Sequence, residues 1–409
     1  MNGSNGQDRI GGNLATGQAD MVRSPLVAFI CFLIAILEGF DLQVAGIAAP
    51  NLKADFSLDP TILGWFFSAS TVGLLIGALA GGRLSDRLGR ERILLWSVVA
   101  FGTASILTGL SQNPAMLIAT RIATGLGLGG ALPNLLAFTS DHAPPGRERR
   151  AVAWLYCGVP IGGAAVSLIG AALGTDWRTP FIIGGALPLL LAAMLWRVMP
   201  PASAPMQWKE KPQGVADALF GGGRITSTLL IWTSFFATLI ILYLVLNWLP
   251  MLLTAMGLDR RTTFLAQLAF HGGGLVLCAI TAPLLDLRRG WLVALGAFAT
   301  IPLLLWYAPA VNDAHAAVLF AFLLGGAVLV TQSYLYALAP RLYPVASRGT
   351  GVGAAVAAGR IGSIAGPLLG AMLVSAGGGM GTVLRGIIPV ALAAGVAAIL
   401  VSLRQPRSR

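Results

Sequence analysis

The sequence predicts an all-α polytopic membrane protein with twelve transmembrane helices. Of its 409 residues, 56% are hydrophobic and only 11% are charged, far below the roughly 25% charged residues of a soluble domain. Apolar runs of about 20 residues, each long enough to cross a bilayer, recur along the whole chain. The basic residues gather in alternate connections between these runs. These observations leave no room for a separate soluble domain.

Each apolar run is a candidate spanning helix, because a helix satisfies all of its backbone hydrogen bonds inside lipid. The predicted spans are 26–50, 62–82, 93–111, 115–139, 151–174, 180–199, 229–255, 264–285, 290–309, 314–339, 351–375 and 386–403.

The chain also divides into two halves of six helices. Its longest connection is polar and rich in Pro and Gly, and Gly129-Gly130 is echoed by Gly325-Gly326 about 200 residues later. Internal repeats of this kind are common in secondary transporters, whose site lies at the midplane between the halves. We expect the following order: a cytoplasmic tail 1–25, a bundle 26–199, a cytoplasmic loop 200–228, a bundle 229–403 and a cytoplasmic tail 404–409.

The net charge of +11 reflects membrane topology rather than an affinity for nucleic acid. With both termini inside, the external loops carry few basic residues, namely Lys53, Arg178, Arg260, Arg261 and Arg385, while most others fall in internal loops and the C-terminal tail. Cytoplasmic loops are enriched in Lys and Arg in this way. We therefore expect a multi-pass protein with both termini in the cytoplasm, surrounded by lipid and without a nucleic-acid partner.

Motifs of enzymes and of metal or cofactor binding are missing from the sequence. It has no nucleotide-binding P-loop, no G-x-S-x-G elbow and no histidine set with zinc spacing. Cys31, Cys157 and Cys278 each lie in a different apolar run, which does not indicate a disulfide framework. We expect neither catalysis, nor a metal, nor a cofactor.

Four charged residues lie well inside predicted spans, away from the span ends, where an ionised side chain costs roughly 2.5–3.5 kcal/mol even on lenient insertion scales. Glu38 and Asp41 share one helix face at i, i+3, and Arg121 and Arg360 lie in two other spans. Acids on one helix and bases on two others indicate a proton-coupled site for an anion. The alternative is a fixed structural ion pair.

The connection after the second span carries a dense motif made of Gly82, Asp86, Arg87, Gly89 and Arg90. It resembles the G-x-x-x-D-R-x-G-R signature of the major facilitator superfamily, except that Glu91 stands where a basic residue is more usual. Glycines permit a tight turn, and a carboxylate at position 86 can bond a helix end or an arginine. The resemblance implies that this loop is a cytoplasmic gate.

Other segments narrow the resemblance to the aromatic acid:proton symporters of that superfamily. Glu38-Gly39-Phe40-Asp41 is similar to their D-G-x-D motif, and Gly359-Arg360-Ile361-Gly362 matches their G-R-x-G motif. The resemblance implies a monomer of the bacterial inner membrane. Its expected substrate is an aromatic carboxylate, either 3-(3-hydroxyphenyl)propionate or a related phenylpropionate or hydroxybenzoate, imported with protons. An exporter of drugs or metabolites working by proton antiport is the alternative.

Within such a symporter, Asp41 is the expected proton carrier, with Glu38 as its coupled neighbour. Either Arg360 or Arg121 would bind the substrate carboxylate, since a guanidinium suits that geometry. Arg121 could instead hold Asp41 ionised, and the sequence does not rank these two roles.

Two polar pairs at i, i+4 spacing are further candidates for contacts with the aromatic ring: Tyr243 with Asn247, and Gln332 with Tyr336. They could equally be contacts between helices. His271, inside an apolar span, is expected to be a satisfied core histidine rather than a proton relay.

Overall fold

The computed structural model describes residues 7–141, 148–174, 176–198, 215–285, 290–344 and 347–404. Every regular element in these ranges is a helix. Eleven of the described helices are long and apolar enough to cross a membrane, and a shorter apolar stretch, Cys157–Leu173, lies in a further helix. The predicted all-helical class with two six-helix halves is confirmed.

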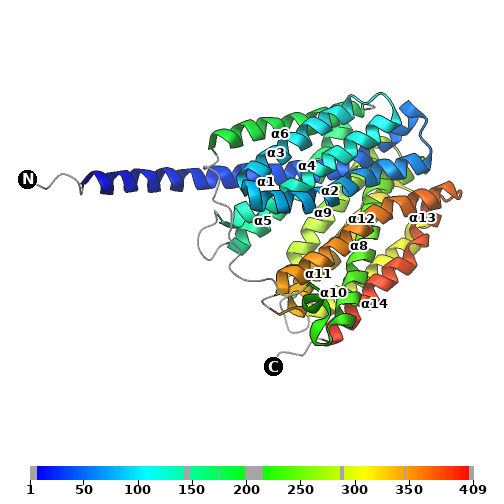
Figure 1. The fold of residues 1–409 in the computed structure, drawn as a ribbon. Helices are drawn as coiled ribbons and strands as arrows, with labels where there is room; N and C mark the ends of the chain where they lie inside the picture. Colours follow the sequence, from blue (N-terminus) through cyan, green and yellow to red (C-terminus); the bar gives the residue numbers. More distant parts are fainter. Residues whose placement is uncertain are drawn as a thin grey trace, which may run out of the picture.

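The first half contains six helices, each matching one predicted span and extending beyond it at its N-terminal end: α1 (Gln7–Phe56), α2 (Pro60–Leu88), α3 (Arg90–Gly109), α4 (Pro114–Asp141), α5 (Glu148–Leu173) and α6 (Arg178–Val198). Helix α1 begins at Gln7, so much of the predicted tail 1–25 is helical. In Figure 1 this end of α1 projects beyond the bundle.

The second half repeats the pattern: α8 (Ile225–Ala255), α9 (Arg260–Leu285), α10 (Gly290–Tyr307), α11 (Ala314–Leu338), α12 (Arg348–Ser375) and a last span made of α13 (Met380–Gly386) and α14 (Ile388–Arg404). The described part of the predicted central loop contains the short helix α7 (Val215–Phe220) and a 3₁₀ turn, η1 (Gly221–Gly223). Two further 3₁₀ turns, η2 (Ala308–Ala310) and η3 (Ala339–Leu342), follow α10 and α11.

Local sequence signals explain several helix ends. The Asp59 side chain accepts a hydrogen bond from the Ile62 amide at 2.8 Å, and Pro60 occupies the first turn of α2. Asp313 caps α11 in the same way through the Ala316 amide. Gly89 separates α2 from α3 with φ 91°, a conformation that favours glycine.

Glycine-lined contacts join equivalent helices in the two halves. In the first half α2 packs on α4, and a Cβ at Gly125 would overlap the carbonyl oxygen of Ser70. In the second half α9 packs on α11, and a Cβ at Gly325 would overlap the carbonyl oxygen of Phe270. Likewise α1 pairs with α5, and α8 with α12. Equivalent helix pairs in the two halves thus pack through glycines, as expected for an internal repeat.

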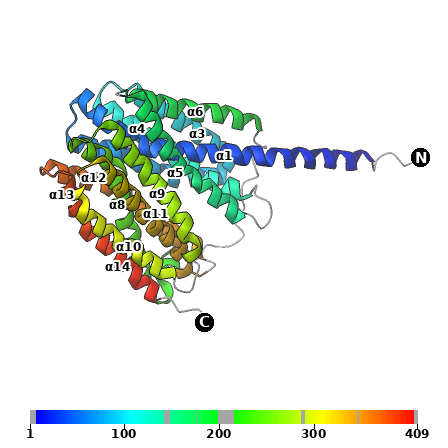
Figure 2. The ribbon, with the colours of Figure 1, turned by 180° about the vertical axis from the view of Figure 1, so that it is seen from behind.

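The two bundles meet at the end remote from the chain termini and diverge toward the end that carries them (Figures 1 and 2). At the junction, the Phe67 ring on α2 packs edge-on against Trp248 on α8, with ring centroids 5.3 Å apart. The Ser68 hydroxyl on α2 donates to the Ile364 carbonyl on α12 at 2.8 Å. These contacts lie nearer the remote ends of their helices.

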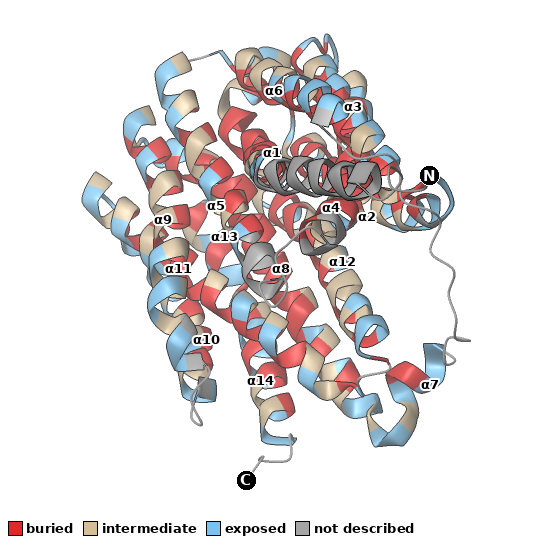
Figure 3. Cartoon of the chain, turned by 90° about the vertical axis from the view of Figure 1, so that its left-hand side faces the viewer, coloured by how far each residue is buried: buried red, intermediate tan, exposed pale blue. Residues whose placement is uncertain are grey.

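Buried residues lie on helix faces turned toward one another, and exposed residues lie around the perimeter (Figure 3). Many of the exposed side chains are large and apolar, such as Trp196 and Leu190. A soluble protein rarely leaves so many of them uncovered, whereas lipid accommodates them.

Candidate functional site

Arg121 and Asp41 form a buried ion pair in the first half. Arg121 Nη1, on α4, donates to the two carboxylate oxygens of Asp41, on α1, at 2.8 and 3.0 Å. Arg121 Nη2 also donates to the Asp41 backbone carbonyl at 3.3 Å. Both side chains are about 2% exposed or less. In such a dry setting, removing either partner leaves an uncompensated charge, at a typical cost of 3–5 kcal/mol.

Aromatic rings flank this pair. The Arg121 guanidinium carbon lies 5.9 Å from the centroid of Phe66 and 5.8 Å from that of Phe181, within the range of cation–π attraction. Its Nε has no hydrogen-bond partner among the described residues. The guanidinium is therefore committed to Asp41 while keeping one unused donor.

The other intramembrane arginine lies in the second half and has a different environment. Arg360 Nη1, on α12, donates to the Tyr243 hydroxyl on α8 at 3.0 Å. Arg360 is only half-buried, whereas Tyr243 is buried. The Glu38 carboxylate, on α1 of the first half, interacts electrostatically with both Arg360 and Asp41. Glu38 thus links the charged groups of the two halves.

The remaining predicted ring contacts differ in their surroundings. Tyr336, on α11, packs edge-on against Phe235 at 5.2 Å and interacts electrostatically with Tyr243. The Asn247 side chain donates to the Tyr243 carbonyl of its own helix at 2.8 Å. Gln332 is half-buried on α11. Their roles toward a ligand stay predictions.

The predicted gate motif lies at the turn between α2 and α3, at the end of the bundle that carries the termini. Gly82 and the exposed Arg87 lie on the last turns of α2, and Arg90 begins α3. The Gly89 amide donates to the Ser85 carbonyl, which closes the turn. The side chain of Asp86 lies outside the described ones, so its predicted latch stays a prediction.

A polar cluster at the junction of the halves was not expected from the sequence. Gln267 Nε2, on α9, donates to Gln43 Oε1 on α1 and to the Leu246 carbonyl on α8, both at 3.1 Å. His271 lies one turn further along α9 and is also buried. Its Nε2 has no hydrogen-bond partner among the described residues, so the prediction of a satisfied core histidine is wrong for that atom. The i, i+4 spacing of Gln267 and His271 was the available signal.

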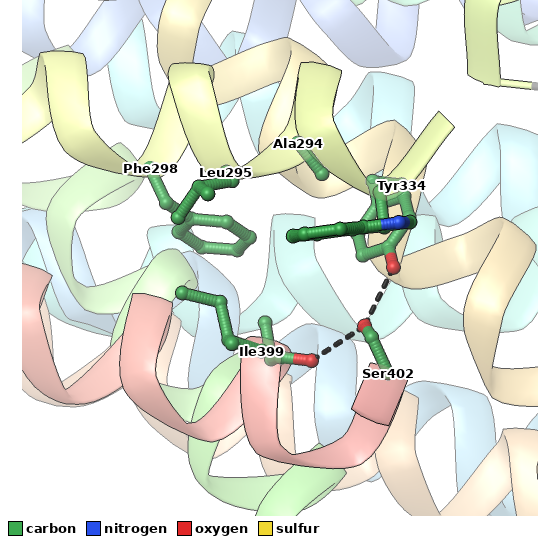
Figure 4. A pocket seen from close by; sticks show the side chains of 8 residues that line it. Ala294, Leu295, Phe298, Tyr334, Ile399 and Ser402 are labelled. Carbon is green, nitrogen blue, oxygen red and sulfur yellow. Dashed lines mark hydrogen bonds between the residues drawn. The ribbon is translucent and has the colours of Figure 1, made fainter. Parts of the chain in front are cut away.

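A small pocket between α10, α11 and α14 contains none of the predicted site residues (Figure 4). Its walls are mainly apolar, and they include a short chain in which the Tyr334 hydroxyl bonds Ser402, which donates to the Ala398 carbonyl. It lies apart from the charged groups and is not the candidate site.

Two helical bundles that enclose buried charges at their junction form the architecture of a secondary transporter. Residues 31–367 match the family model described as Major Facilitator Superfamily. The chain is 40% identical over 397 residues to the 3-(3-hydroxy-phenyl)propionate transporter of Escherichia coli, covering 96% of this chain and 97% of that one. It is 31% identical to the 4-hydroxybenzoate transporter PcaK of Pseudomonas putida, covering 90% of each chain.

Solved structures agree on the fold. A bacterial homologue of the human lysosomal transporter Spinster, in an inward-facing and occupied conformation, superposes with a TM-score of 0.76 at 17% identity, covering 93% of this chain and 97% of that one. A D-xylose–proton symporter gives a TM-score of 0.73 at 18% identity, covering 93% of this chain and 98% of that one. The chain belongs to the major facilitator superfamily, and the predicted resemblance is confirmed.

Proposed function

We propose that this protein is a proton-coupled symporter that imports an aromatic carboxylate, a phenylpropionate or a hydroxybenzoate, by alternating access. The observation that carries the proposal is the unequal state of the two intramembrane arginines. Arg121 is bonded to Asp41 within one half, whereas the half-buried Arg360 donates to a tyrosine hydroxyl and interacts electrostatically with Glu38 of the other half. The relatives that transport 3-(3-hydroxy-phenyl)propionate and 4-hydroxybenzoate support the substrate class.

Arg360 is the proposed ligand for the substrate carboxylate. A guanidinium binds a carboxylate through two parallel hydrogen bonds, and Tyr243 fixes the orientation of its Nη1. The nearby Glu38 carboxylate competes for the same cation, so an arriving anion is favoured when Glu38 is protonated. This competition would couple substrate binding to a proton.

Asp41 is the proposed proton carrier, and Arg121 is the group that keeps it ionised between transport cycles. An incoming proton neutralises Asp41 and weakens its bonds to Arg121. An inside-negative membrane potential opposes entry of an anion by about 2.3 kcal/mol per 100 mV, and a co-transported proton cancels that charge. Each pH unit of gradient then adds about 1.4 kcal/mol of driving force.

The proposal includes a location and an assembly state. We place the protein in the bacterial inner membrane with both termini in the cytoplasm, as the distribution of basic residues indicates. A monomer suffices, because both halves that flank the charged groups come from one chain.

Purified protein in proteoliposomes tests the proposal. An imposed pH gradient, acid outside, should concentrate a radiolabelled phenylpropionate or hydroxybenzoate, and an uncoupler should abolish that accumulation. Mass spectrometry should recover the substrate unchanged. Uptake that equilibrates without exceeding the external concentration would rule out symport, and proton-driven efflux would favour the exporter.

A further inference from the structure

The polar cluster at the junction, made of Gln43, Gln267 and His271, takes no part in the proton and carboxylate chemistry above. All three side chains are nine-tenths or more buried, at 4%, 1% and 5% exposed. They come from α1 in one half and α9 in the other. A buried polar group is normally hydrogen-bonded, so any member without a partner requires an explanation.

Two atoms of the cluster have no hydrogen-bond partner among the described residues: Gln267 Oε1 and His271 Nε2. The orientation of the Gln267 amide is fixed by its neighbours. Its nitrogen faces the Leu246 carbonyl, which can only accept a hydrogen bond. The unpaired oxygen is therefore an acceptor that needs a donor, and an unpaired imidazole nitrogen lies one turn away on the same helix face.

The chemistry of these two atoms selects a hydroxyl group as their ligand. A hydroxyl donates one hydrogen bond and accepts others, so one hydroxyl can serve both the amide oxygen and the imidazole. A carboxylate only accepts, and the amide oxygen would repel it. The two cations suited to a carboxylate, Arg121 and Arg360, donate to Asp41 and Tyr243 and not to the unpaired atoms of the cluster.

Along the helices, the cluster is displaced from the proposed carboxylate site toward the remote end of the bundle. Gln43 follows Glu38 by five residues on α1, a rise of about 7.5 Å at 1.5 Å per residue. On α8, Leu246 follows Tyr243 by three residues, about 4.5 Å. Both displacements lead toward the remote ends of the helices. Along both helices the cluster therefore lies beyond the proposed carboxylate site, and we take the ring of a phenylpropionate held by Arg360 to extend in that direction.

Helix α5 closes the cluster on its third side. A Cβ at Gly163 would lie 2.6 Å from His271 Cε1 and Nε2, and 3.0 Å from Gln43 Cγ. Glycine is therefore required for the imidazole to keep this position. A methyl group at position 163 would displace the imidazole without removing any polar side chain.

We infer that Gln267 and His271 form a subsite for a hydroxyl on the ring of the transported acid, with Gln43 holding Gln267 in place. The inference rests on the proposed function and adds to it a preference for hydroxylated over unsubstituted aromatic acids. A site built to bond a hydroxyl discriminates against the analogue that lacks it, because its polar groups are then left unpaired.

Proteoliposome uptake of 3-(3-hydroxyphenyl)propionate and 3-phenylpropionate tests the inference. The wild type should show a KM about tenfold or more lower for the hydroxylated acid. Gln267→Met and His271→Phe, which keep volume but remove the polar atoms, should raise that KM about tenfold and change the other less than twofold. Gly163→Ala should act in the same direction. Ser167→Ala is the control, since among the described residues that hydroxyl donates to the Gly163 carbonyl of its own helix.

The outcomes separate the two claims. If the wild type takes up neither these acids nor 4-hydroxybenzoate, the proposed function is wrong and the subsite falls with it; if it takes up only hydroxybenzoates, 4-hydroxybenzoate and benzoate replace the two phenylpropionates in the same comparison. If the wild type takes up both acids with equal KM, the function stands and the subsite is wrong, whatever the variants do. If the variants raise both KM values equally, the cluster only packs the halves together.

Discussion

Arg121 holds Asp41 across the first half through three hydrogen bonds, two to the carboxylate at 2.8 and 3.0 Å and one to the backbone carbonyl at 3.3 Å. Since α1 and α4 belong to the same half, this pair can persist while the halves move. Glu38 differs, because its electrostatic partner Arg360 belongs to the other half. Of these two acids, three residues apart on α1, we therefore expect only Glu38 to change its charged partner when the halves move.

The first prediction concerns the proton. Asp41→Asn keeps the volume of the side chain but removes the titratable group and leaves Arg121 without a counter-charge. We expect accumulation driven by a pH gradient to be abolished, while binding of the aromatic acid survives at acidic pH. Uptake in proteoliposomes and equilibrium binding in detergent measure the two effects.

Asp55→Asn is the matched control for that variant. Asp55 lies on the same helix, near the remote end of α1, where its carboxylate accepts a hydrogen bond from the Trp177 indole. It should transport normally. Normal concentrative uptake with unchanged pH dependence in Asp41→Asn would show that the proton is carried elsewhere.

The second prediction concerns the carboxylate. Arg360→Lys keeps the charge but loses the paired donors, so binding of the acid should weaken by about 1–3 kcal/mol. A neutral amide analogue should lose little further affinity. Tyr243→Phe removes the bond that orients Arg360 and should weaken binding less, by about 1 kcal/mol. Calorimetry of the purified variants provides the affinities.

Wild-type affinity in Arg360→Lys would contradict this assignment and make Arg121 the next candidate. Arg121→Lys distinguishes the two arginines as ligands of the carboxylate. If Arg360 is the ligand, this variant should impair the pH response of uptake more than the affinity for the acid.

The third prediction concerns the loop between α2 and α3. Asp86→Asn should slow transport while leaving the protein folded, since it removes a gate contact rather than core packing. The substrate affinity in detergent should change by less than about tenfold, or 1.4 kcal/mol. Asp217→Asn, in the central connection, is the control. Wild-type transport rates in Asp86→Asn would show that Asp86 is no latch.

The fourth prediction concerns packing. A Cβ at Gly162 would overlap the Ile36 carbonyl oxygen on α1, so Gly162→Ala should destabilise the protein by about 1–3 kcal/mol. Gly296→Ala is the control, because nothing lies within 4 Å of a Cβ there. That variant should be as stable as the wild type or slightly more stable. Thermal unfolding in detergent, followed by tryptophan fluorescence, measures both. Equal melting temperatures would contradict the packing role.

The fifth prediction concerns topology. Single cysteines introduced at Gly3 and Ser408, with the native cysteines replaced, should resist impermeant thiol reagents in intact cells and react after lysis. Labelling of either position from outside would overturn the orientation inferred from the basic residues.

Hydrophobic run length was sufficient to locate the spanning helices, because a run of about 20 apolar residues has few alternatives to a membrane helix. The cap at Asp59 explains why α2 begins two residues before the predicted span 62–82. The helical extension of α1 back to Gln7 had no such signal, since residues 7–25 are polar and rich in Gly.

The charged residues inside the bundle could be found from the sequence, but their pairing could not. The cost of burial singled out Glu38, Asp41, Arg121 and Arg360 as candidates, because a charge inside an apolar span requires a reason. Which arginine meets Asp41 depends on which helices are neighbours. The contact between α1 and α4 joins Asp41 to Arg121, which lies 80 positions away in the sequence. The Gln267–Gln43 bond spans 224 positions. Uncharged residues at such separations carry no local pattern that pairs them.

The glycine-lined contacts within each half have a mechanical consequence. Where backbone meets backbone, no side chain remains that could change rotamer and let the two helices slide. We expect each half to behave as a stiff lever during the transport cycle. When the two halves move to alternate access, we expect the changes to occur mainly at the side-chain contacts between them, such as Phe67 on Trp248 and Ser68 on Ile364. We therefore expect substitutions at those contacts to change the rate of transport, and substitutions at the glycine-lined contacts to change the stability of the protein.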